Sequence, residues 1–354
     1  MNKIVMTGGG SAGHVIVNTV LIPKLINEGW EIIYIGSKNG PEKVMIEAID
    51  GVKYYGVSTG KLRRYLSMEN FKDIFKIIKG IIQSFFIIKR EKVNVIFSCG
   101  GFVTVPTVIG GFFNRAPTII RETDYSIGLA NKICMPFAKH ISVTFSDTVN
   151  EVNINKFIKS GPIIREELKR GSRVAGLKIT NFKGDKPIIL VMGGSQGAKI
   201  INDSLRQSIN ELVTDFDIIH LCGKGKVDNN IKVQGYIQYE YVGEELSHMY
   251  AMSDIVVGRS GSNGVFEGAL LMKPMLLIPI SKKVSRGDQI LNAKYMEGKG
   301  VAKVLLEEDL NCNSLVSGIK SIYNNMNKYL INLLKISDEN NIERQINIIN
   351  KYKK

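Results

Sequence analysis

The sequence predicts an α/β protein made of two Rossmann-like domains that face each other across a cleft. In the first half of the chain, apolar segments of strand length alternate with longer amphipathic segments, which is typical of a mostly parallel sheet. The pattern starts again at residues 188–209, where a strand, a glycine-rich turn and a helix are expected in succession. The 354 residues suit two domains of ordinary size.

The strands of the first domain are expected where short apolar runs end in glycine or polar residues. The first run, residues 3–6, leads through three glycines into an apolar helix. A further helix is expected at residues 128–138. The later strands are expected within residues 31–37, 93–101, 116–124 and 140–146.

The second half repeats this order. After the restart, strands are expected within residues 215–225, 231–237, 254–258 and 274–280. We place the first domain at residues 1–163 and the second at residues 164–336, with a hinge near Ser160–Arg170. The last helix, residues 337–354, is expected to pack back on the first domain.

Charge and cysteine content narrow the class of protein. The formal net charge of +14 suits phosphorylated substrates, anionic lipid or nucleic acid. Nucleic acid is not expected as a partner, because the chain lacks zinc-finger spacing, an RNP-like motif and a helix-turn-helix. The four cysteines are widely spaced, so we expect reduced thiols in a cytosolic protein without a secretory signal.

One uncharged segment, residues 93–114, is long enough to span a bilayer. Five glycine and proline residues interrupt it. A buried parallel strand followed by a short apolar helix is therefore the favoured interpretation, and a transmembrane helix is the alternative.

The first glycine turn fits the dinucleotide-binding pattern G-x-G-x-x-G through Gly8, Gly10 and Gly13. Such a turn lets a phosphate approach the backbone at a helix N-terminus. A dinucleotide enzyme also needs an acidic residue at the end of the second strand, but Gly36 and Ser37 stand there and Glu42 comes later. An NAD(P)-dependent oxidoreductase and a tight turn without a ligand therefore remain alternatives.

The second glycine turn, residues 193–197, fits the nucleophile elbow G-x-S-x-G. A serine hydrolase also needs an acid and then a histidine downstream, and only His220 and His248 follow Ser195. We expect His220 in a strand and His248 in a helix, which suits neither for a triad. Ser195 is better interpreted as a hydroxyl donor to a phosphate.

A third turn precedes a helix that carries Glu267. Ser262, Asn263 and Gly264 open this helix and are placed to hold a diphosphate, while Glu267 lies where a carboxylate accepts two ribose hydroxyls. The alternative for Glu267 is a favourable interaction with the helix dipole. The D-x-D sequence at residues 215–217 comes before a strand, so we interpret it as surface and predict no required metal.

An apolar stripe with a basic rim is expected on a helix at residues 71–90. The stripe consists of Phe71, Ile74, Phe75, Ile78, Ile81, Ile82 and Phe85, and the basic residues are Lys72, Lys76 and Lys79. Anionic bilayer surfaces attract such helices. The alternative is a helix packed in the core with a solvated lysine face.

Seven segments taken together resemble one family. In order, they are GGGSAGHV, SCGGFVTVPTVIGG, RETDYSIGLANK, SGPIIREEL, GGSQGAKIIND, RSGSNGVFEGALL and DQILNAKYMEGKG. Each is weak alone, but the ordered set is similar to the MurG family of bacterial peripheral glycosyltransferases. The resemblance implies the GT-B arrangement, with acceptor and membrane handled by the first domain and the donor by the second. It also implies no cofactor.

The resemblance further implies a reaction and a cellular role. N-acetylglucosamine moves from UDP-N-acetylglucosamine to the C4 hydroxyl of the muramyl sugar in undecaprenyl-diphosphate-linked muramyl pentapeptide, which converts lipid I into lipid II. The implied location is peripheral, on the cytoplasmic face of the cell membrane. The implied role is peptidoglycan precursor synthesis, and with it cell wall biogenesis, cell shape and cell division.

The family pattern assigns site residues in both domains. The donor is implied to contact Ser11, Ala12, Gly13, Asp124, Arg165, Ser195, Gln196, Gly243, Ser262, Asn263, Gly264, Val265, Phe266, Glu267 and Gln289. The acceptor is implied to lie near Gly10, Gly101, Phe102, Glu122 and Asn131. Membrane contact is implied for Phe71, Lys72, Phe75, Lys76 and Lys79.

The chain departs from the family pattern at one segment of the site. The family often has His-Glu-Gln-Asn where this chain has Arg121-Glu122-Thr123-Asp124. A carboxylate at position 124 cannot donate hydrogen bonds as asparagine does. A catalytically inactive sugar-nucleotide or lipid-binding paralogue is therefore a further alternative.

The expected mechanism follows from the substrates. Attack of one hydroxyl on an α-linked UDP-sugar gives a β-linked product by inversion, so one base is needed. His14 is our first candidate because an imidazole titrates near neutrality, and Glu122 is the second. Binding of the lipid diphosphate is the alternative role of His14. Helix N-termini, serine hydroxyls and Arg165 are expected to stabilise the leaving UDP in place of a metal.

Overall fold

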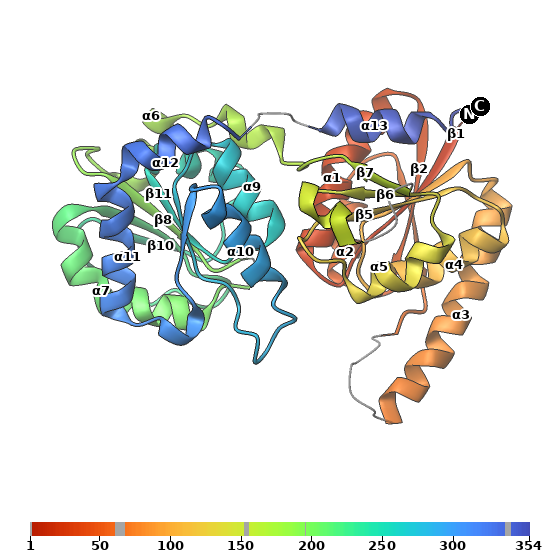
Figure 1. Cartoon of the computed structure of the whole chain (residues 1–354), viewed down its shortest axis with the longest axis horizontal. Coiled ribbons are helices and arrows are strands. Elements are labelled where there is room, and N and C mark those ends of the chain that lie inside the picture. Colours follow the sequence, from red (N-terminus) through yellow and green to blue (C-terminus); the bar gives the residue numbers. More distant parts are fainter. Residues whose placement is uncertain (1, 61–67, 152–155, 195, 337–340) are drawn as a thin grey trace. The chain divides into compact units, whose positions relative to one another are not determined.

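The structure, a computed structural model, describes residues 2–60, 68–151, 156–194, 196–336 and 341–354. It divides the chain into two compact units. Unit 1 holds Met1–Ile164 and Glu339–Lys354, and unit 2 holds Arg165–Asp338. Each unit contains one parallel sheet with helices packed against it (Figure 1). The predicted α/β class with two Rossmann-like domains is confirmed.

Unit 1 is built on a seven-stranded sheet in the order β3-β2-β1-β4-β5-β6-β7. The strands are β1 (Asn2–Thr7), β2 (Trp30–Ser37), β3 (Val52–Val57), β4 (Val95–Ser98), β5 (Thr118–Glu122), β6 (His140–Val143) and β7 (Phe157–Lys159). The helices are α1 (Ala12–Asn27), α2 (Pro41–Glu47), α3 (Met68–Glu91), α4 (Thr104–Phe113), α5 (Leu129–Cys134) and α13 (Ile342–Asn350). All neighbouring strands run parallel, so their crossover connections carry the helices to the faces of the sheet.

The last helix of the chain belongs to unit 1. Ile342, Ile346 and Ile349 of α13 are buried in the same core as Ile4 of β1. Nearby, Lys354 N donates to Asn2 Oδ1 at 2.9 Å, so the two ends of the chain lie side by side (Figure 1). The apolar spacing of α13 therefore matches a helix that covers the first sheet.

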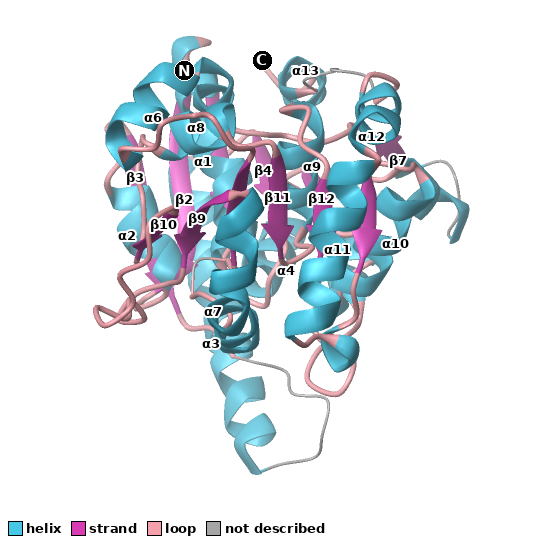
Figure 2. Cartoon of the chain, turned by 90° about the vertical axis from the view of Figure 1, so that its left-hand side faces the viewer, coloured by secondary structure: helices cyan, strands magenta, loops and turns pink. Residues whose placement is uncertain are grey.

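Unit 2 is built on a six-stranded parallel sheet in the order β10-β9-β8-β11-β12-β13. The strands are β8 (Ile188–Met192), β9 (Asp217–Leu221), β10 (Tyr236–Tyr239), β11 (Ile255–Gly258), β12 (Met275–Leu277) and β13 (Ala302–Val304). The helices are α6 (Arg173–Thr180), α7 (Lys199–Asp215), α8 (Leu246–Met252), α9 (Ser262–Leu270), α10 (Asp288–Gly298), α11 (Cys312–Asn324) and α12 (Met326–Leu333). Apolar residues of α7 and α11 share one core with Ile189 and Val191 of β8, so these helices cover one face of the sheet (Figure 2).

Three strands escape the sequence prediction: β3, β7 and β13. All three lie at an edge of their sheet. An edge strand is only half-covered, as the mixed burial of β3 shows, so its sequence lacks the continuous apolar run of a central strand. The other two are only three residues long, which is too short for a periodic pattern.

The apolar stripe of α3 faces outward, so the alternative of a core-packed stripe is wrong for most of it. Phe75 is 70% exposed, and Ile74, Ile78 and Ile82 are each about half exposed. Lys76 and Lys79 are also exposed. The side chains of Phe71 and Lys72 lie outside the described residues.

Small residues explain how α3 leaves this stripe uncovered. A Cβ added to Gly110 of α4 would lie 3.0 Å from Ser84 Cβ, and one added to Gly80 of α3 would lie 3.0 Å from Pro106 Cβ. The two helices therefore pack closely through glycine and serine, and α3 needs no large side chains on that side.

Residues 93–114 form β4 and α4, as the favoured interpretation predicts. Within the described residues, no helix combines the length and the apolarity that crossing a bilayer requires.

Candidate active site

Most of the predicted site residues follow the carboxyl ends of strands in the two sheets. Ligands of open parallel sheets collect at the carboxyl ends of the strands, where the strand order reverses. This reversal lies between β1 and β4 in unit 1 and between β8 and β11 in unit 2. The segments that follow these four strands, residues 8–11, 99–103, 193–198 and 259–261, include three of the glycine turns that the sequence singles out.

In unit 1, His14 lies against the turn that follows β4. A Cβ added to Gly100 would lie 3.6 Å from His14 Cε1, and one added to Gly101 would lie 3.3 Å from His14 Cδ2. Ser11 is the N-cap residue of α1, which places Gly13 and His14 in its first turn. The structure thus brings His14 together with Gly101, next to the half-buried Phe102. The side chain of Ala12 lies outside the described residues.

Glu42 fills the space beside the first glycine turn. Its carboxylate accepts hydrogen bonds from Gly10 N at 3.4 Å, from Ser37 N at 2.9 Å and from the Ser37 hydroxyl. A Cβ added to Gly9 would lie 2.6 Å from the Glu42 carboxyl carbon. The Glu42 carboxyl group therefore lies between the first glycine turn and the end of β2.

Two stacked tyrosines support the first glycine turn and the end of β2. Tyr34 Oη donates to Gly8 O at 2.6 Å, and Tyr54 Oη donates to Ser37 O at 2.6 Å. Their rings lie 5.8 Å apart and nearly parallel. Burial raises the pKa of both phenols, so both remain donors at neutral pH.

Glu122, the second candidate base, holds the loop that follows β5. Its oxygens accept from Asp124 N at 3.1 Å, Gly128 N at 2.8 Å and Asn131 Nδ2 at 2.9 Å. Burial, and after it the charge of Asp124, raises the pKa of Glu122 to about 7 although these hydrogen bonds oppose the shift. The structure therefore joins Glu122, Asp124 and Asn131 in one cluster.

Arg121, where the chain departs from the family pattern, is fully buried. Its Nη1 donates to Ser160 Oγ at 2.7 Å and to Gln345 Oε1 at 3.3 Å, and its Nη2 donates to Thr144 Oγ1 at 3.1 Å and to Gly161 O at 2.7 Å. Burial lowers the pKa of Arg121 to about 10. This value is still well above 7, so the guanidinium stays charged at neutral pH. This side chain ties β5 to α13 and to the segment that follows β7.

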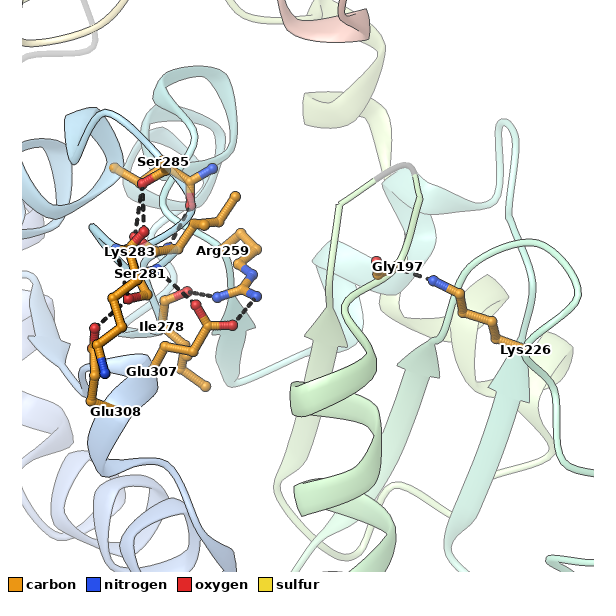
Figure 3. Close-up of polar contacts among 11 residues, drawn as sticks. Gly197, Lys226, Arg259, Ile278, Ser281, Lys283, Ser285, Glu307 and Glu308 are labelled. Atoms are coloured by element: carbon orange, nitrogen blue, oxygen red, sulfur yellow. Dashed lines mark hydrogen bonds and ion pairs between the residues drawn. The ribbon is translucent and has the colours of Figure 1, made fainter. Parts of the chain in front are cut away.

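In unit 2, the glycine turn after β8 lies beside a lysine that the sequence did not single out. Lys226 Nζ donates to Gln196 O at 2.6 Å and to Gly197 O at 3.3 Å, which Figure 3 shows for Gly197. Ser195, predicted as a donor ligand, lies outside the described residues. No sequence motif marks Lys226, because it belongs to the loop after β9, and only the fold brings it to this turn.

The third turn is tied to α10. Ser260 Oγ donates to Gln289 O at 2.8 Å, and Asn292 Nδ2 donates to Ser260 O at 3.1 Å. The Gln289 side chain accepts from Ile280 N at 3.2 Å. Gly261 is the N-cap residue of α9, whose first two turns hold the predicted donor residues Ser262, Asn263, Gly264, Val265, Phe266 and Glu267.

Arg165 and Glu267, predicted as separate donor ligands, pair with each other. Arg165 Nε donates to Glu267 Oε1 at 2.9 Å, and Arg165 Nη2 donates to Oε2 at 3.1 Å. Glu267 is buried, whereas the Arg165 side chain keeps about a quarter of its surface exposed. The pair therefore places a cation and a carboxylate side by side at the second turn of α9.

Other residues that the sequence raised lie outside this cluster. Gly243 is in the loop between β10 and α8, where its N–H donates to Glu245 Oε2 at 3.0 Å. Asp215 ends α7 and Asp217 begins β9, so the D-x-D sequence lies at the amino end of the strand as predicted. His220 is buried in β9, and burial lowers its pKa to about 3. That environment does not suit a hydrolase base.

A polar network stabilises the loop between β12 and α10. Arg259 donates to Ile278 O at 3.1 Å and to Glu307 Oε1 at 2.7 Å, and Ser281 N donates to Glu307 Oε2 at 2.7 Å (Figure 3). The Ser281 hydroxyl also bonds Glu308. The network fixes the loop that precedes Gln289.

Comparison with known families gives a consistent result. Residues 4–143 match the glycosyltransferase family 28 N-terminal domain, and residues 188–348 match the glycosyltransferase family 28 C-terminal domain. A protein of Geobacillus thermodenitrificans is 51% identical over 348 residues, which cover 98% of each chain. Its name is UDP-N-acetylglucosamine--N-acetylmuramyl-(pentapeptide) pyrophosphoryl-undecaprenol N-acetylglucosamine transferase. A protein of Clostridium novyi with the same name is 47% identical over 354 residues, which cover 99% of each chain.

Solved structures share the fold. MurG of Acinetobacter baumannii matches with a TM-score of 0.76 and 21% identity over 99% of this chain and 100% of that chain. A calicheamicin glycosyltransferase matches with a TM-score of 0.70 and 11% identity over 99% of this chain and 98% of that chain. At these identities the likeness bears on the fold alone.

Proposed function

Since this chain belongs to glycosyltransferase family 28, we propose that it transfers N-acetylglucosamine from UDP-N-acetylglucosamine to the lipid-linked muramyl pentapeptide. This is the reaction for which its relatives at 47–51% identity are named. The product is lipid II, and the physiological role is peptidoglycan precursor synthesis.

The observation that carries the proposal is the Arg165–Glu267 pair at the second turn of α9. A nucleotide sugar presents a ribose diol and a diphosphate next to each other. A carboxylate accepts hydrogen bonds from the diol, and a guanidinium beside it donates to a phosphate oxygen. The first turn of α9 and the glycine turn before α7 add backbone N–H groups of the kind that bind anions. Unit 2 therefore has the chemistry of a UDP-sugar site.

In unit 1 we assign the base of the reaction to His14 rather than to Glu122. His14 is partly exposed at the mouth of two glycine turns, where an incoming sugar hydroxyl can approach. Glu122 is buried, and three donors already occupy its two oxygens. It acts in this proposal as a positioning residue that shapes the loop carrying Asp124.

We assign the outward stripe of α3 to a membrane surface, on the cytoplasmic face. Phe86 of α3 and Phe113 at the end of α4, which the sequence did not single out, are each 62% exposed. Aromatic and aliphatic side chains among lysines bind the boundary between acyl chains and anionic headgroups. Such a surface lets an enzyme reach a lipid-linked acceptor without spanning the bilayer.

Titration calorimetry tests the donor assignment against the oxidoreductase alternative. We expect UDP-N-acetylglucosamine to bind without added metal and NADPH to give no heat of binding. Binding of NADPH without UDP-N-acetylglucosamine would overturn the proposal. The Glu42 side chain, which fills the space beside the first glycine turn, is the physical reason to expect rejection of NADPH.

A further inference from the structure

Asn18 is a buried polar residue within an apolar helix. It lies in α1, one turn after His14, and its side chain is fully buried. Its buried neighbours along the helix are Val15, Val17, Leu21 and Ile22. Asparagine is a weak helix former, and its burial costs free energy unless its amide is hydrogen-bonded. We therefore expect a specific set of hydrogen bonds around this side chain.

The amide of Asn18 joins α1 to β1, to β2 and to the segment that follows β4. Its Nδ2 donates to Thr7 O, at the end of β1, at 3.3 Å and to Tyr34 Oη of β2 at 3.1 Å. Its Oδ1 accepts from Cys99 Sγ, directly after β4, at 3.1 Å. A backbone carbonyl only accepts, so Thr7 O fixes the orientation of the amide. Burial raises the pKa of the Cys99 thiol to about 12, so the thiol stays protonated and donates at neutral pH.

The same contacts fix the turn that begins at Gly8. Tyr34 Oη, which accepts from Asn18, donates to Gly8 O at 2.6 Å. A Cβ added to Gly8 would lie 2.6 Å from His14 O. It would also lie 2.9 Å from Asn18 Nδ2 and 3.2 Å from Cys99 Cβ. Gly8 is therefore packed between α1 and Cys99, with no space for a side chain.

These hydrogen bonds determine how α1 lies against the turn that follows β4. Gly100 and Gly101 come directly after Cys99, and the His14 ring packs against both glycines, 3.6 Å and 3.3 Å from where their Cβ atoms would lie. The hydrogen bond between Asn18 and Cys99 thus connects the helix that carries the imidazole to the turn that the imidazole contacts. Without this bond, α1 can shift against the turn and carry the ring with it.

We propose that Asn18 is a positioning residue that holds the imidazole of His14 at the turn after β4, where the base of the reaction meets the acceptor hydroxyl. The inference rests on the proposed function and adds a residue that the family resemblance does not assign. Asn18 itself touches no substrate, because its side chain is fully buried. Its effect on the reaction passes through His14, since a displacement of about 1 Å can lower a rate by about two orders of magnitude.

The first test is the steady-state kinetics of Asn18→Ala, which removes every hydrogen bond of the amide. We expect kcat to fall about 10- to 100-fold, because His14 is no longer held in place. The KM for UDP-N-acetylglucosamine should stay within about twofold of wild type, since the donor is placed in unit 2. The matched control is Asn94→Ala. Asn94 Oδ1 accepts from Lys3 N at 2.9 Å and joins β1 to β4 at their amino ends, so kcat should stay within about twofold of wild type. Equal losses in the two variants, or no loss in Asn18→Ala, would overturn the inference.

A double variant tests whether Asn18 acts through His14. In His14→Ala there is no imidazole left to position, so the addition of Asn18→Ala should lower the remaining kcat by less than about twofold. A residue that only stabilises the fold would lower the remaining transfer by the same factor as it does when His14 is present. That result would overturn the role of Asn18 as a positioning residue.

Cys99 tests the hydrogen bond itself with a smaller change in the core. Cys99→Ala removes the donor to Asn18 Oδ1, so kcat should fall severalfold. Cys99→Ser restores an O–H donor at this position and should bring kcat back to within about threefold of wild type. Equal kcat values in these two variants would contradict a role for the hydrogen bond. The comparison also decides the question if Asn18→Ala does not fold.

The NMR signal of the His14 ring separates this inference from the proposed function, because it requires no catalysis. The chain has four histidines, so comparison with His14→Ala identifies the His14 signal in protein with labelled imidazole groups. The signal should move in Asn18→Ala and in Cys99→Ala and should stay in place in Asn94→Ala. If wild type shows no transfer while these changes occur, the proposed function fails and the link between Asn18 and His14 stands. If wild type transfers N-acetylglucosamine but neither kcat nor the His14 signal changes in Asn18→Ala, only the present inference fails.

Discussion

Arg165 and Glu267 form a two-point ion pair, with Nε to Oε1 at 2.9 Å and Nη2 to Oε2 at 3.1 Å. The two residues are 102 positions apart in the sequence, and β8 and β11 with their turns lie between them. In the proposed donor site, the pair holds the buried Glu267 side chain in place before the ligand arrives.

Glu267→Gln should weaken the donor site. The amide keeps the size of the side chain but loses its negative charge. The carboxylate of Glu267 orients Arg165 and, in the proposed site, accepts hydrogen bonds from the ribose. We expect the KM for UDP-N-acetylglucosamine to rise about 10- to 100-fold, as for the loss of a hydrogen bond to a charged group. Steady-state kinetics with saturating acceptor measures this. The matched control is Glu307→Gln, which breaks the Arg259–Glu307 pair in the same unit and should affect this KM less.

His14→Ala should slow the chemical step and leave donor binding nearly intact. A general base contributes about 10²- to 10⁴-fold to the rate, so kcat should fall by a factor in that range. The KM for UDP-N-acetylglucosamine should stay within about threefold of wild type, because we place the donor in unit 2. An unchanged kcat would remove His14 from the mechanism.

Glu122 should make stability depend on pH. Its pKa of about 7 in the folded protein exceeds the ordinary value of 4.5, so the folded protein holds a proton that the unfolded chain releases between these values. Stability should therefore fall as pH rises from 4.5 to about 7 and then level off, by about 3 kcal/mol in full. Thermal unfolding at pH 5 and pH 8 measures the fall. Glu122→Gln should show a smaller difference between the two pH values, and an equal difference would contradict this assignment.

The α3 surface should bind anionic vesicles through both its apolar and its basic residues. Phe75→Ser combined with Phe86→Ser should reduce co-sedimentation severalfold, because burial of apolar area is lost. The triple variant Lys72→Glu, Lys76→Glu, Lys79→Glu should also reduce co-sedimentation. This reduction should be larger at low salt than at high salt, because salt screens charges. Val44, 77% exposed on α2, provides the control Val44→Ser. Binding equal to wild type in both multiple variants would place the membrane surface elsewhere.

The central strands and the glycine turns could be predicted from the sequence because both signals are local. A buried parallel strand such as β1 is a continuous apolar run, and a turn that needs a positive φ, as at Gly10 and Gly194, selects glycine. The orientation of α3 is not local. The same stripe of Phe and Ile suits a core or an exposed face, and Gly110 on α4 decides between them.

The site was predicted only in part, because its side chains are brought together by non-local contacts. Sequence motifs identify residues one at a time. Arg165 and Glu267 were therefore each predicted to contact the donor, and their pairing with each other was not predicted. Glu42 and Lys226 were not assigned a role, because each reaches its glycine turn from a different loop or helix. Only the fold reveals such neighbours.

Transfer of radiolabelled N-acetylglucosamine from UDP-N-acetylglucosamine to a lipid I analogue, without added metal, tests the proposed function most directly. We predict transfer by wild type to give a product with a β linkage, and we predict a loss of most of this transfer in His14→Ala. Normal binding of UDP-N-acetylglucosamine by wild type without transfer to the analogue would contradict the account and favour a non-catalytic paralogue.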